Sequence, residues 1–176
     1  MSDVLGRVFM AIFGCLLLFI MPVVLITQKQ DVLAQTYIDN AVVEFVDNAR
    51  AAGKITPRAY ENMCSKIDAA HMLCDIRITH SAAYTVPTAL NEDGLFDTEV
   101  YRYDYIKQDI LEKMYIENGE TVTTKDYPLK AGDYLKVEVK NISPTLGTRM
   151  RRIFSNKGGD TTLFTTYGGY VGNNRQ

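Results

Sequence analysis

The sequence contains few of the residues on which enzymatic chemistry most often depends. Its 176 residues include two histidines, three cysteines and no tryptophan. Neither His71 nor His80 belongs to a G-x-S-x-G nucleophile motif, and the chain has no G-x-x-x-x-G-K-[ST] or G-x-G-x-x-G phosphate-binding loop. Catalysis needs a nucleophile and a base held together, or a metal. We therefore expect no catalytic residues, no cofactor and no small-molecule substrate.

The chain also lacks an excess of charge of either sign. It has 19 Lys and Arg residues against 21 Asp and Glu residues, for a formal net charge of −2. Strong binding to nucleic acid or to an anionic membrane surface depends on a concentrated positive charge. The composition therefore predicts no nucleic-acid partner.

Four scattered residues are the only set with a ligand composition suited to zinc, namely Cys64, His71, Cys74 and His80. Their spacing, C-x6-H-x2-C-x5-H, lacks the close ligand pairs of structural zinc sites. We therefore expect packed or surface side chains and no metal. A Cys64–Cys74 disulfide is the alternative if the domain is extracellular, provided that the helix carrying Cys64 ends early.

No charged residue occurs between Val8 and Gln28, and this absence is the most informative one. The 20 residues from Val8 to Thr27 form a helix of about 30 Å, the thickness of a bilayer core. A transmembrane helix over residues 8–27 is therefore predicted, with Pro22 bending its axis. Its anchoring side chains are Val8, Phe9, Phe13, Leu17, Phe19, Pro22 and Leu25.

Two other interpretations of this segment are open. A cleaved secretory signal could end at Val32-Leu33-Ala34, but its apolar region would be longer than the usual 7–15 residues or so. A lipoprotein box could end at Cys15, although most of the apolar residues follow that cysteine. Length and flanking residues favour the permanent anchor.

The charges around the predicted span suggest its orientation. Arg7 and the terminal amine outweigh Asp3, so residues 1–7 are expected to form a short cytoplasmic tail. Residues 54–176 would then form an extracytoplasmic head, and the protein would be a single-pass membrane protein.

The segment from Gln28 to Ala52 contains neither proline nor glycine, so the helix is expected to continue through it. Apolar residues recur there at steps of three and four, which predicts an amphipathic extension over residues 28–53 ending at Gly53. We expect the head to cover an apolar stripe formed by Val32, Leu33, Ile38, Val42, Phe45, Val46 and Ala49.

The remaining sequence predicts an α+β head with a mainly antiparallel sheet. Thr56-Pro57 has the residue types of a helix start, and this helix is expected to end near residues 72–74. Further helices are expected at 105–118 and 143–154, strands at 75–86, 133–141 and 160–174, and a loop at 87–98. Gly168-Gly169 is expected to interrupt the last strand.

Two surface groups have both a plain and a functional interpretation. Tyr101, Tyr103 and Tyr105 suit an interaction surface, although tyrosines also pack with only the hydroxyl exposed. The basic group of Arg149, Arg151, Arg152 and Lys157 is expected to be a solvated helix face.

The short tail, the apolar span and its unbroken helical extension into a small head resemble pilin-like membrane proteins. The segments "YPLKAGDYLKVEVKN" and "YGGYVGN" are similar to the heads of TadE-like proteins and pseudopilins. The resemblance implies a minor pilin or pseudopilin of a type IV pilus-related, Tad-like, secretion or conjugation apparatus. It also implies membrane lipid and either pilin-like subunits or assembly-platform proteins as partners.

Processing of such proteins occurs at a glycine before the hydrophobic stretch, which places the corresponding site at Gly6 and Arg7. Filament subunits of the family often carry a Glu near the new N-terminus that neutralises a neighbour's amine. Here no acidic residue lies between Asp3 and Asp31. We therefore expect a minor, unprocessed component. The alternative is a signal-anchored module that binds a ligand or peptide in a deep pocket lined by Tyr and Arg.

Overall fold

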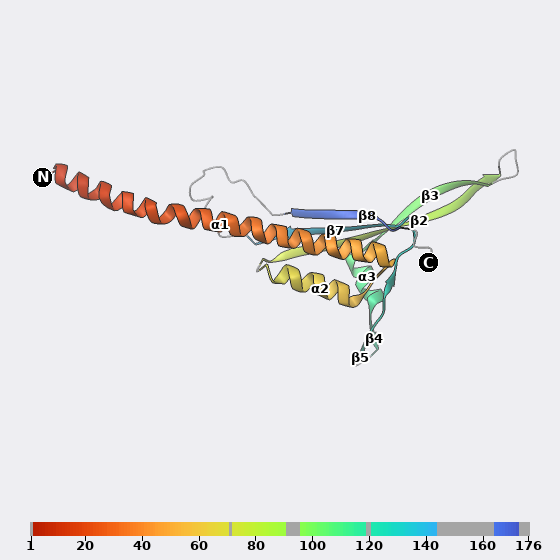
Figure 1. Ribbon diagram of the computed structural model, residues 1–176. Coiled ribbons are helices and arrows are strands. Elements are labelled where there is room, and N and C mark those ends of the chain that lie inside the picture. The colour runs from red at the N-terminus through yellow and green to blue at the C-terminus, as the bar shows by residue number, and fades with distance from the viewer. Residues whose placement is uncertain (1, 71, 91–95, 119–120, 144–163, 173–176) are drawn as a thin grey trace.

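A long N-terminal helix and a four-stranded antiparallel sheet dominate the structure, which is a computed structural model (Figure 1). The structure describes residues 2–70, 72–90, 96–118, 121–143 and 164–172. Helix α1 (Ser2–Ala52) is 51 residues long, and the sheet packs along its C-terminal part. The predicted α+β class is confirmed, and the architecture is pilin-like.

Helix α1 passes through Pro22 without a break and continues to Ala52, as the absence of proline and glycine between Gln28 and Ala52 predicts. It ends where Gly53 adopts a φ of +64°, a conformation that favours glycine over residues with a side chain. The span and its extension are therefore one continuous helix, which at about 1.5 Å per residue is about 75 Å long.

Helix α2 (Pro57–Asp68) begins as its sequence predicts. The Thr56 hydroxyl accepts a hydrogen bond from the Ala59 N–H at 3.2 Å, and Pro57 occupies the first helical position. The expected end near residues 72–74 is wrong. The helix ends at Asp68, and the Ala70 N–H donates to the Ile67 carbonyl in a tight turn that follows it. The chain leaves the helix early because Cys74 already belongs to the main sheet, where it lies opposite Asn141.

The main sheet has the order β3-β2-β7-β8, with every neighbouring pair antiparallel. Its strands are β2 (Cys74–Leu90), β3 (Phe96–Ile106), β7 (Tyr134–Asn141) and β8 (Phe164–Tyr170). In β7, the buried Leu135, Val137 and Val139 alternate with more exposed residues, as predicted. Two small antiparallel pairs complete the head, β1 (Lys54–Ile55) with β6 (Tyr127–Pro128) and β4 (Tyr115–Asn118) with β5 (Thr121–Thr124).

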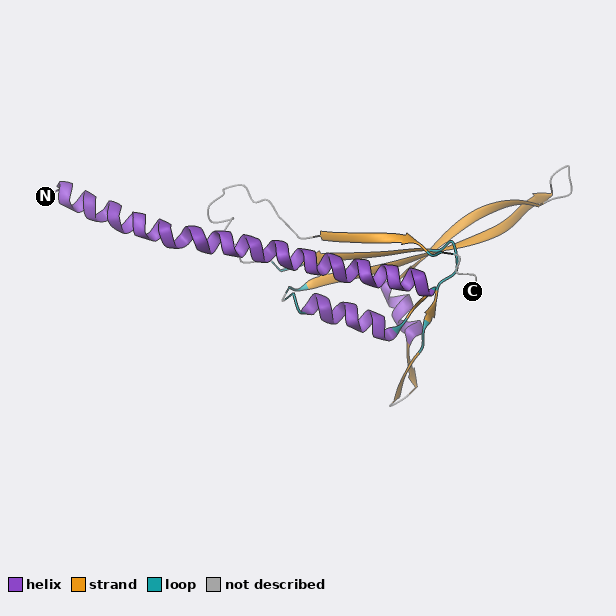
Figure 2. Cartoon of the chain, viewed as in Figure 1, coloured by secondary structure: helices purple, strands orange, loops and turns teal. Residues whose placement is uncertain are grey.

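The predicted loop at residues 87–98 is wrong at both ends. β2 continues to Leu90 and β3 begins at Phe96, so the two strands form an arm that projects beyond the rest of the sheet (Figure 2). Their register shifts between Pro87 and Ala89. A bulge of this kind accommodates a proline, which cannot donate a hydrogen bond within a ladder.

The predicted helix at 105–118 is shorter than expected. Helix α3 (Lys107–Met114) starts where the Asp109 carboxylate accepts the Ile106 N–H at 3.0 Å. Tyr105 and Ile106 complete β3, and the residues after Met114 form β4. The β-branched and aromatic Tyr115-Ile116 pair favours a strand over a helix.

The expected interruption of the last strand is also wrong, because β8 runs through Gly168 and Gly169. A Cβ at Gly168 would lie 2.8 Å from both the Leu135 carbonyl and the Tyr134 hydroxyl, and one at Gly169 would meet the Arg50 guanidinium at 2.5 Å. The glycines allow neighbouring groups to cover the strand. The helix predicted at 143–154 and its basic group lie outside the described residues, apart from Ser143.

The core lies between α1 and the sheet, with α2 and α3 closing its sides (Figure 1). The predicted stripe is buried in its C-terminal part, comprising Ile38, Val42, Phe45, Val46 and Ala49. Its first two residues contradict the prediction, since Val32 and Leu33 remain 64% and 69% exposed. They precede Asp39, the residue at which β8 first bonds the helix through Thr165.

Candidate functional site

The N-terminal part of α1, before the buried Thr27, is an apolar surface that the described head does not cover. Its most apolar window has a mean hydropathy of 2.9, and none of that window is buried. Exposure ranges from 45% at Leu17 to 77% at Phe19, and it is also high at the other predicted anchor side chains Val8, Phe9, Phe13 and Leu25. Pro22 lies on the same exposed length. This length and composition are consistent with membrane anchoring.

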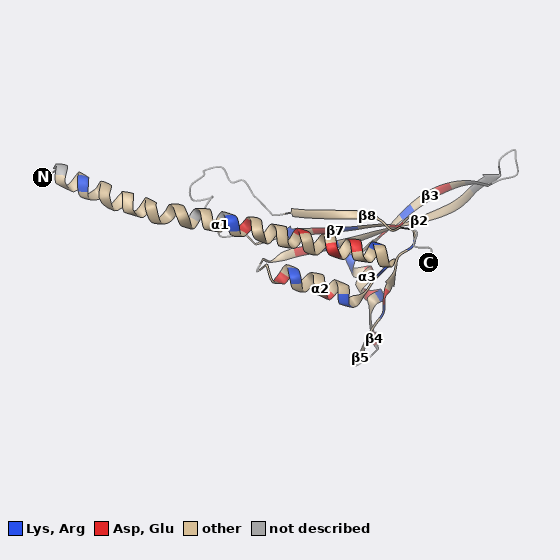
Figure 3. Ribbon diagram, viewed as in Figure 1, with Lys and Arg blue, Asp and Glu red and all other residues tan. Residues whose placement is uncertain are grey.

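Charged residues divide the helix in the same way. In the sequence no charge lies between Arg7 and Lys29, and Figure 3 shows the N-terminal part of α1 as a long, mostly tan length of helix. Gly6 and Arg7, the predicted processing site, both lie within the first turns of α1. No described atom lies within 4 Å of the position that a Cβ on Gly6 would occupy. Processing there stays a prediction.

Polar side chains fix the other part of α1 to the head. The Arg50 guanidinium donates to the Tyr170 carbonyl at 2.8 Å and to Asp47 at 3.0 Å, and the Tyr167 hydroxyl donates to Asp47 at 3.2 Å. On the opposite side, Lys66 of α2 reaches Glu44 at 2.6 Å. These contacts join the helix to both neighbouring elements, so the head and α1 form one packed unit.

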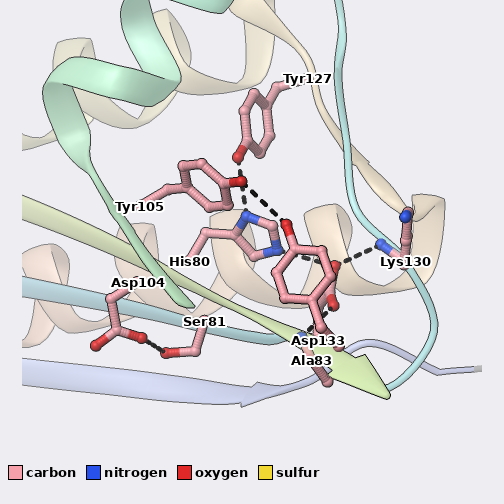
Figure 4. Close-up of polar contacts among 9 residues, drawn as sticks. His80, Ser81, Ala83, Asp104, Tyr105, Tyr127, Lys130 and Asp133 are labelled. Atoms are coloured by element: carbon pink, nitrogen blue, oxygen red, sulfur yellow. Dashed lines mark hydrogen bonds and ion pairs between the residues drawn. The ribbon is translucent and has the colours of Figure 1, made fainter. Parts of the chain in front are cut away.

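A buried polar cluster centred on His80 holds the base of the arm (Figure 4). The His80 ring stands between Tyr127, whose hydroxyl lies 2.9 Å from Nδ1, and Asp133, whose carboxylate lies 2.9 Å from Nε2. Asp133 also accepts the N–H groups of Lys130 at 2.8 Å and Ala83 at 3.1 Å. The cluster therefore links β2, β6 and the turn before β7.

The hydrogen-bonding groups of this cluster satisfy one another. Burial alone would raise the pKa of the Asp133 carboxyl, but the hydrogen bonds from Lys130, His80 and Ala83 lower it below its usual value. A neutral imidazole with its proton on Nε2 satisfies both partners, because Nε2–H donates to Asp133 and Nδ1 accepts from Tyr127. Burial raises the pKa of Tyr127 and keeps its hydroxyl protonated.

The histidine and aspartate do not form a hydrolytic triad with the neighbouring serine. Ser81 follows His80 in β2, so its side chain projects from the opposite face of the sheet. There its hydroxyl donates to Asp104 instead (Figure 4). Every hydrogen-bonding position of the His80 ring is already used, and this arrangement is that of a structural cluster.

The structure describes three of the four residues considered as zinc ligands. His80 is committed to the buried cluster, and His71 lies outside the described residues. Among the described residues, no group of three or more His, Cys, Asp or Glu side chains is placed to hold a metal ion.

The Cys64–Cys74 disulfide, considered above as an alternative, is not present in the structure, in which both cysteines are free. Cys64 packs beside Tyr60 on α2, while Cys74 is held in β2 opposite Asn141. Burial raises the pKa of both thiols, so they behave as small partly buried hydrophobic groups and not as reactive thiolates.

The three tyrosines of β3 follow one face of the arm. Tyr105 stacks on His80 with a centroid distance of 5.7 Å, and Tyr103 meets Tyr105 edge-on at 4.8 Å. The Tyr84 and Tyr105 hydroxyls lie 3.0 Å apart. Tyr101 and Tyr103 are largely exposed beyond the core, so their role in an interaction stays a prediction.

A groove between α1 and α2 differs from the ligand pocket that the alternative function requires. Its lining includes Ala41, Asn48, Asn62 and Met63, together with the paired Glu44 and Lys66. These side chains come from the two helices, not from the Tyr and Arg residues of the head. The groove therefore gives no support to that alternative.

The sequence did not reveal the cluster around Asp133. That residue was placed at the start of the strand expected at 133–141, and 53 positions separate it from His80. Its one local signal is the Ala131-Gly132-Asp133 turn, in which Gly132 has a φ of +91°. Comparison of the chain with protein-family models, curated proteins and solved structures finds no match.

Proposed function

We propose that the protein is a single-pass, membrane-anchored, pilin-like component, a minor pilin or pseudopilin, of a type IV pilus-related, Tad-like, secretion or conjugation apparatus. The observation that carries this proposal is the division of one continuous helix. Its N-terminal part is bare and apolar, and its C-terminal part forms the spine of an antiparallel sheet domain.

The bare part provides the anchor. Residues 8–27 match the thickness of a bilayer core at about 1.5 Å per residue, and lipid would cover the side chains that the head leaves exposed. Arg7 on the short N-terminal side keeps that end in the cytoplasm. The head, residues 54–176, then lies outside the membrane.

The covered part of α1 connects the anchor rigidly to the head. No linker separates the two, because α1 is unbroken and its last turn bonds β8 through Arg50. A head mounted in this way keeps a fixed orientation relative to the membrane. This rigidity suits a protein that contributes geometry and binding surfaces to an assembly.

Assembly and binding, not turnover, is the proposed mode of action. Membrane lipid and other pilin-like subunits or assembly-platform proteins are the proposed partners, and nucleic acid is not one of them. His80 and Asp133 are both buried, and their side chains form hydrogen bonds to each other and to neighbouring groups of the head. This arrangement supports a structural role for the pair.

Membrane fractionation of the full chain tests the anchor. We expect the protein to resist alkaline extraction and added protease to digest the head only from the extracytoplasmic side. A double Phe13→Asp, Leu17→Asp variant should leave the membrane, because each carboxylate at the centre of a span costs about 2.5–3.5 kcal/mol. The control is Val122→Asp, which adds a charge at a residue that is 60% exposed in the head.

Chemical cross-linking in native membranes tests the assembly. We expect an amine-reactive reagent to produce species larger than the monomer that contain further pilin-like chains or platform proteins. Recovery of the intact chain as an extractable monomer would contradict the proposal, as would equal membrane retention of the double variant and the control.

A further inference from the structure

Two exposed apolar side chains lie at the end of the main sheet that is nearest the bare part of α1 (Figure 1). They are Leu73, which is 67% exposed, and Ile142, which is 64% exposed. The Ile142 N–H donates to the Leu73 carbonyl at 2.8 Å, which extends the β2–β7 ladder one position beyond Cys74 and Asn141. Met72 and Cys74 pack against the core, so strand alternation places Leu73 and Ile142 on the outer face of the sheet, away from α1. We call these two residues the basal pair.

The basal pair differs from the rest of that face along β2 and β7. Beyond it, the next three pairs along the two strands are polar: Asp75 with Lys140, Arg77 with Glu138, and Thr79 with Lys136. Arg77 bonds Asp75 at 3.2 Å and Lys136 bonds Glu138 at 2.6 Å, within each strand. A polar outer face is what a half-buried antiparallel sheet presents to water. The apolar basal pair departs from this pattern only at the end nearest the anchor.

The basal pair lies at the height of Val32 and Leu33 on α1. β7 and β8 run alongside α1, and Thr165 of β8 bonds Asp39 (Figure 1). Ile142 lies three residues beyond the partner of Thr165 in β7, which is about 10 Å toward the N-terminal end of α1. On a helix, about 10 Å corresponds to six or seven residues, which leads from Asp39 back to Val32 and Leu33.

This height coincides with the surface of the bilayer proposed above. Val32 lies five residues beyond Thr27, the last residue of the proposed span, which is about 7.5 Å along the helix. The headgroup layer occupies about 5–7.5 Å on each side of the hydrocarbon core. Val32 and Leu33, which are 64% and 69% exposed, therefore lie at the outer limit of that layer, together with the basal pair.

The surroundings of these residues favour lipid over a charged partner. The apolar surface of α1 continues from the span into this level, because Leu25, Lys29, Val32 and Leu33 line one surface of the helix. Lys29 is placed to extend its amine into the headgroups while its apolar stem stays along the helix. The formal net charge of −2 does not select an anionic surface, so the contact is an apolar one that zwitterionic lipid satisfies.

We propose that Val32, Leu33 and the basal pair form a lipid-contacting base, on which the head rests against the headgroup layer of the membrane that holds the anchor. This contact rests on the anchor proposed above and extends it from the helix to the head. It also accounts for the exposure of Val32 and Leu33, which the head leaves uncovered because lipid covers them.

A base of this kind sets the tilt of α1. Transmembrane helices tilt by about 20° on average, and interfacial side chains help to fix the direction of the tilt. The basal pair lies on the far side of the sheet from α1, so its contact with lipid favours a lean of the helix toward the sheet. Because α1 and the head form one packed unit, the same lean sets the direction in which the head presents its surfaces to an assembly.

Depth-dependent fluorescence quenching of the full chain tests the base. Cys15, Cys64 and Cys74 are replaced by Ala, and a single Leu73→Cys or Ile142→Cys is labelled with a nitrobenzoxadiazole probe. The chain is placed in phosphatidylcholine vesicles that contain a lipid with a nitroxide on its headgroup. We expect at least twofold quenching and a blue-shifted emission at both positions.

Two control positions give the expected gradient. Val100→Cys matches the basal pair in exposure, at 63%, but belongs to the arm at the opposite end of the head, so its probe should not be quenched (Figure 1). Lys140→Cys lies two residues above Ile142 on the same face, about 7 Å farther from the membrane, and should give intermediate quenching.

A charged variant tests whether the apolar side chains hold the head down. Leu73→Asp combined with Ile142→Asp should lower quenching of the Lys140→Cys probe at least twofold, whereas Val100→Asp should leave it unchanged. All three positions are exposed, so the thermal melting of these variants should match that of their parent. Alkaline extraction should also be unchanged, because the span itself is intact.

Photolabelling of the unmodified chain avoids the cysteine replacements. A phosphatidylcholine with a diazirine close to its headgroup should attach to the segments that contain Leu73 and Ile142, as mapped by mass spectrometry. It should not attach to the arm segment that contains Val100.

Three results would overturn the inference. The first is quenching at the basal pair no greater than at Val100. The second is a blue-shifted emission without quenching by the nitroxide lipid, which would mean that a second copy or another protein covers the base. The third is unchanged quenching of the Lys140→Cys probe in the doubly charged variant.

A probe on Cys15 separates this inference from the anchor on which it rests. Cys15 is exposed within the proposed span and is labelled in a chain with Cys64→Ala and Cys74→Ala. If a nitroxide at the end of the acyl chain quenches this probe but the basal pair is not quenched, the base is wrong and the anchor stands. If neither probe is quenched, both fail.

Discussion

The two parts of α1 are made from similar apolar residues but differ in what surrounds them. Leu17 and Phe19 in the N-terminal part are exposed to whatever surrounds the molecule, whereas Phe45 and Val46 in the C-terminal part are sealed under the sheet. The apolar residue types alone do not separate the two parts. The difference lies in the polar residues of the C-terminal part, among which Asp39, Asp47 and Arg50 reach the head.

This comparison shows how one helix serves two environments. A helix that is apolar all round suits lipid, while one with a single apolar stripe suits a protein core. In α1 the first pattern passes into the second without a break. The anchor and the spine of the head are therefore mechanically one element, and substitutions should affect the two parts differently.

The largest effect should come from a buried charge in the covered part. Val46→Asp places a carboxylate at a fully buried position and should destabilise the head by about 3–5 kcal/mol, enough to unfold a marginal domain. Leu17→Asp should leave the melting temperature of the head unchanged and weaken membrane retention instead. Near-UV circular dichroism during heating measures the first effect, and alkaline extraction measures the second. Equal melting temperatures for Val46→Asp and Leu17→Asp would contradict the proposed difference between the two parts of α1.

Removal of an aromatic ring from each part should give a smaller difference of the same kind. Phe45→Ala leaves a cavity beneath the sheet and should lower the free energy of unfolding by about 3–4 kcal/mol. The Phe19 side chain is exposed and lies outside the core of the head, so Phe19→Ala should leave that free energy unchanged. Urea unfolding of the detergent-solubilised chain, followed by tyrosine fluorescence, compares the two. A similar loss in both variants would show that the head extends farther along α1.

The His80 cluster should make the stability of the head depend on acid. Asp133→Asn loses the charge-assisted bonds and should cost about 1–3 kcal/mol at pH 7. Because hydrogen bonding lowers the pKa of Asp133 in the folded state, its contribution is present above the unfolded value of about 3.9 and disappears as the pH falls through the folded pKa. The stability gap between wild type and variant should therefore narrow below about pH 4. A constant gap from pH 3 to 7 would contradict this role.

The smallest effect should come from the ion pair that joins α1 to α2. The Lys66 and Glu44 side chains are 30% and 51% exposed, so solvent screens their 2.6 Å contact. Lys66→Ala should cost at most about 0.5–1 kcal/mol, and the loss should shrink in high salt. Chemical denaturation at two salt concentrations measures it, with Lys140→Ala as a control. A loss comparable to that of Phe45→Ala would mean that charge, not packing, holds the helices together.

Features that depend on local sequence were predictable. The continuation of the helix beyond the apolar run follows from the absence of proline and glycine between Gln28 and Ala52, the start of α2 from Thr56-Pro57, and β7 from its alternation. The extended arm was not predictable, because Pro87 and the residues after it favour a loop locally. Pairing of β2 with β3 overrides that preference, because Pro87 pairs with Thr98 and Leu90 with Phe96 across a hairpin that single-residue propensities do not reveal.

The candidate site shows the same division. The length of the apolar run identifies the proposed anchor directly, but periodicity does not say where the head stops covering the helix. For that reason Val32 and Leu33 were placed in the covered stripe. The hydrogen-bond partners of His80 come from two other segments, β6 and the turn before β7, and only the folded chain brings Tyr127 and Asp133 to its ring.

The most direct test of the central claim, that the bare part of α1 is a retained membrane anchor, is the intact mass and N-terminal sequence of the chain purified from alkali-resistant native membranes. The account predicts a chain that begins at Met1 or Ser2 and keeps residues 8–27. A start at Arg7 would keep the anchor and show prepilin-type processing, with filament incorporation as the leading role. A start near Gln35 would remove the span and contradict the claim.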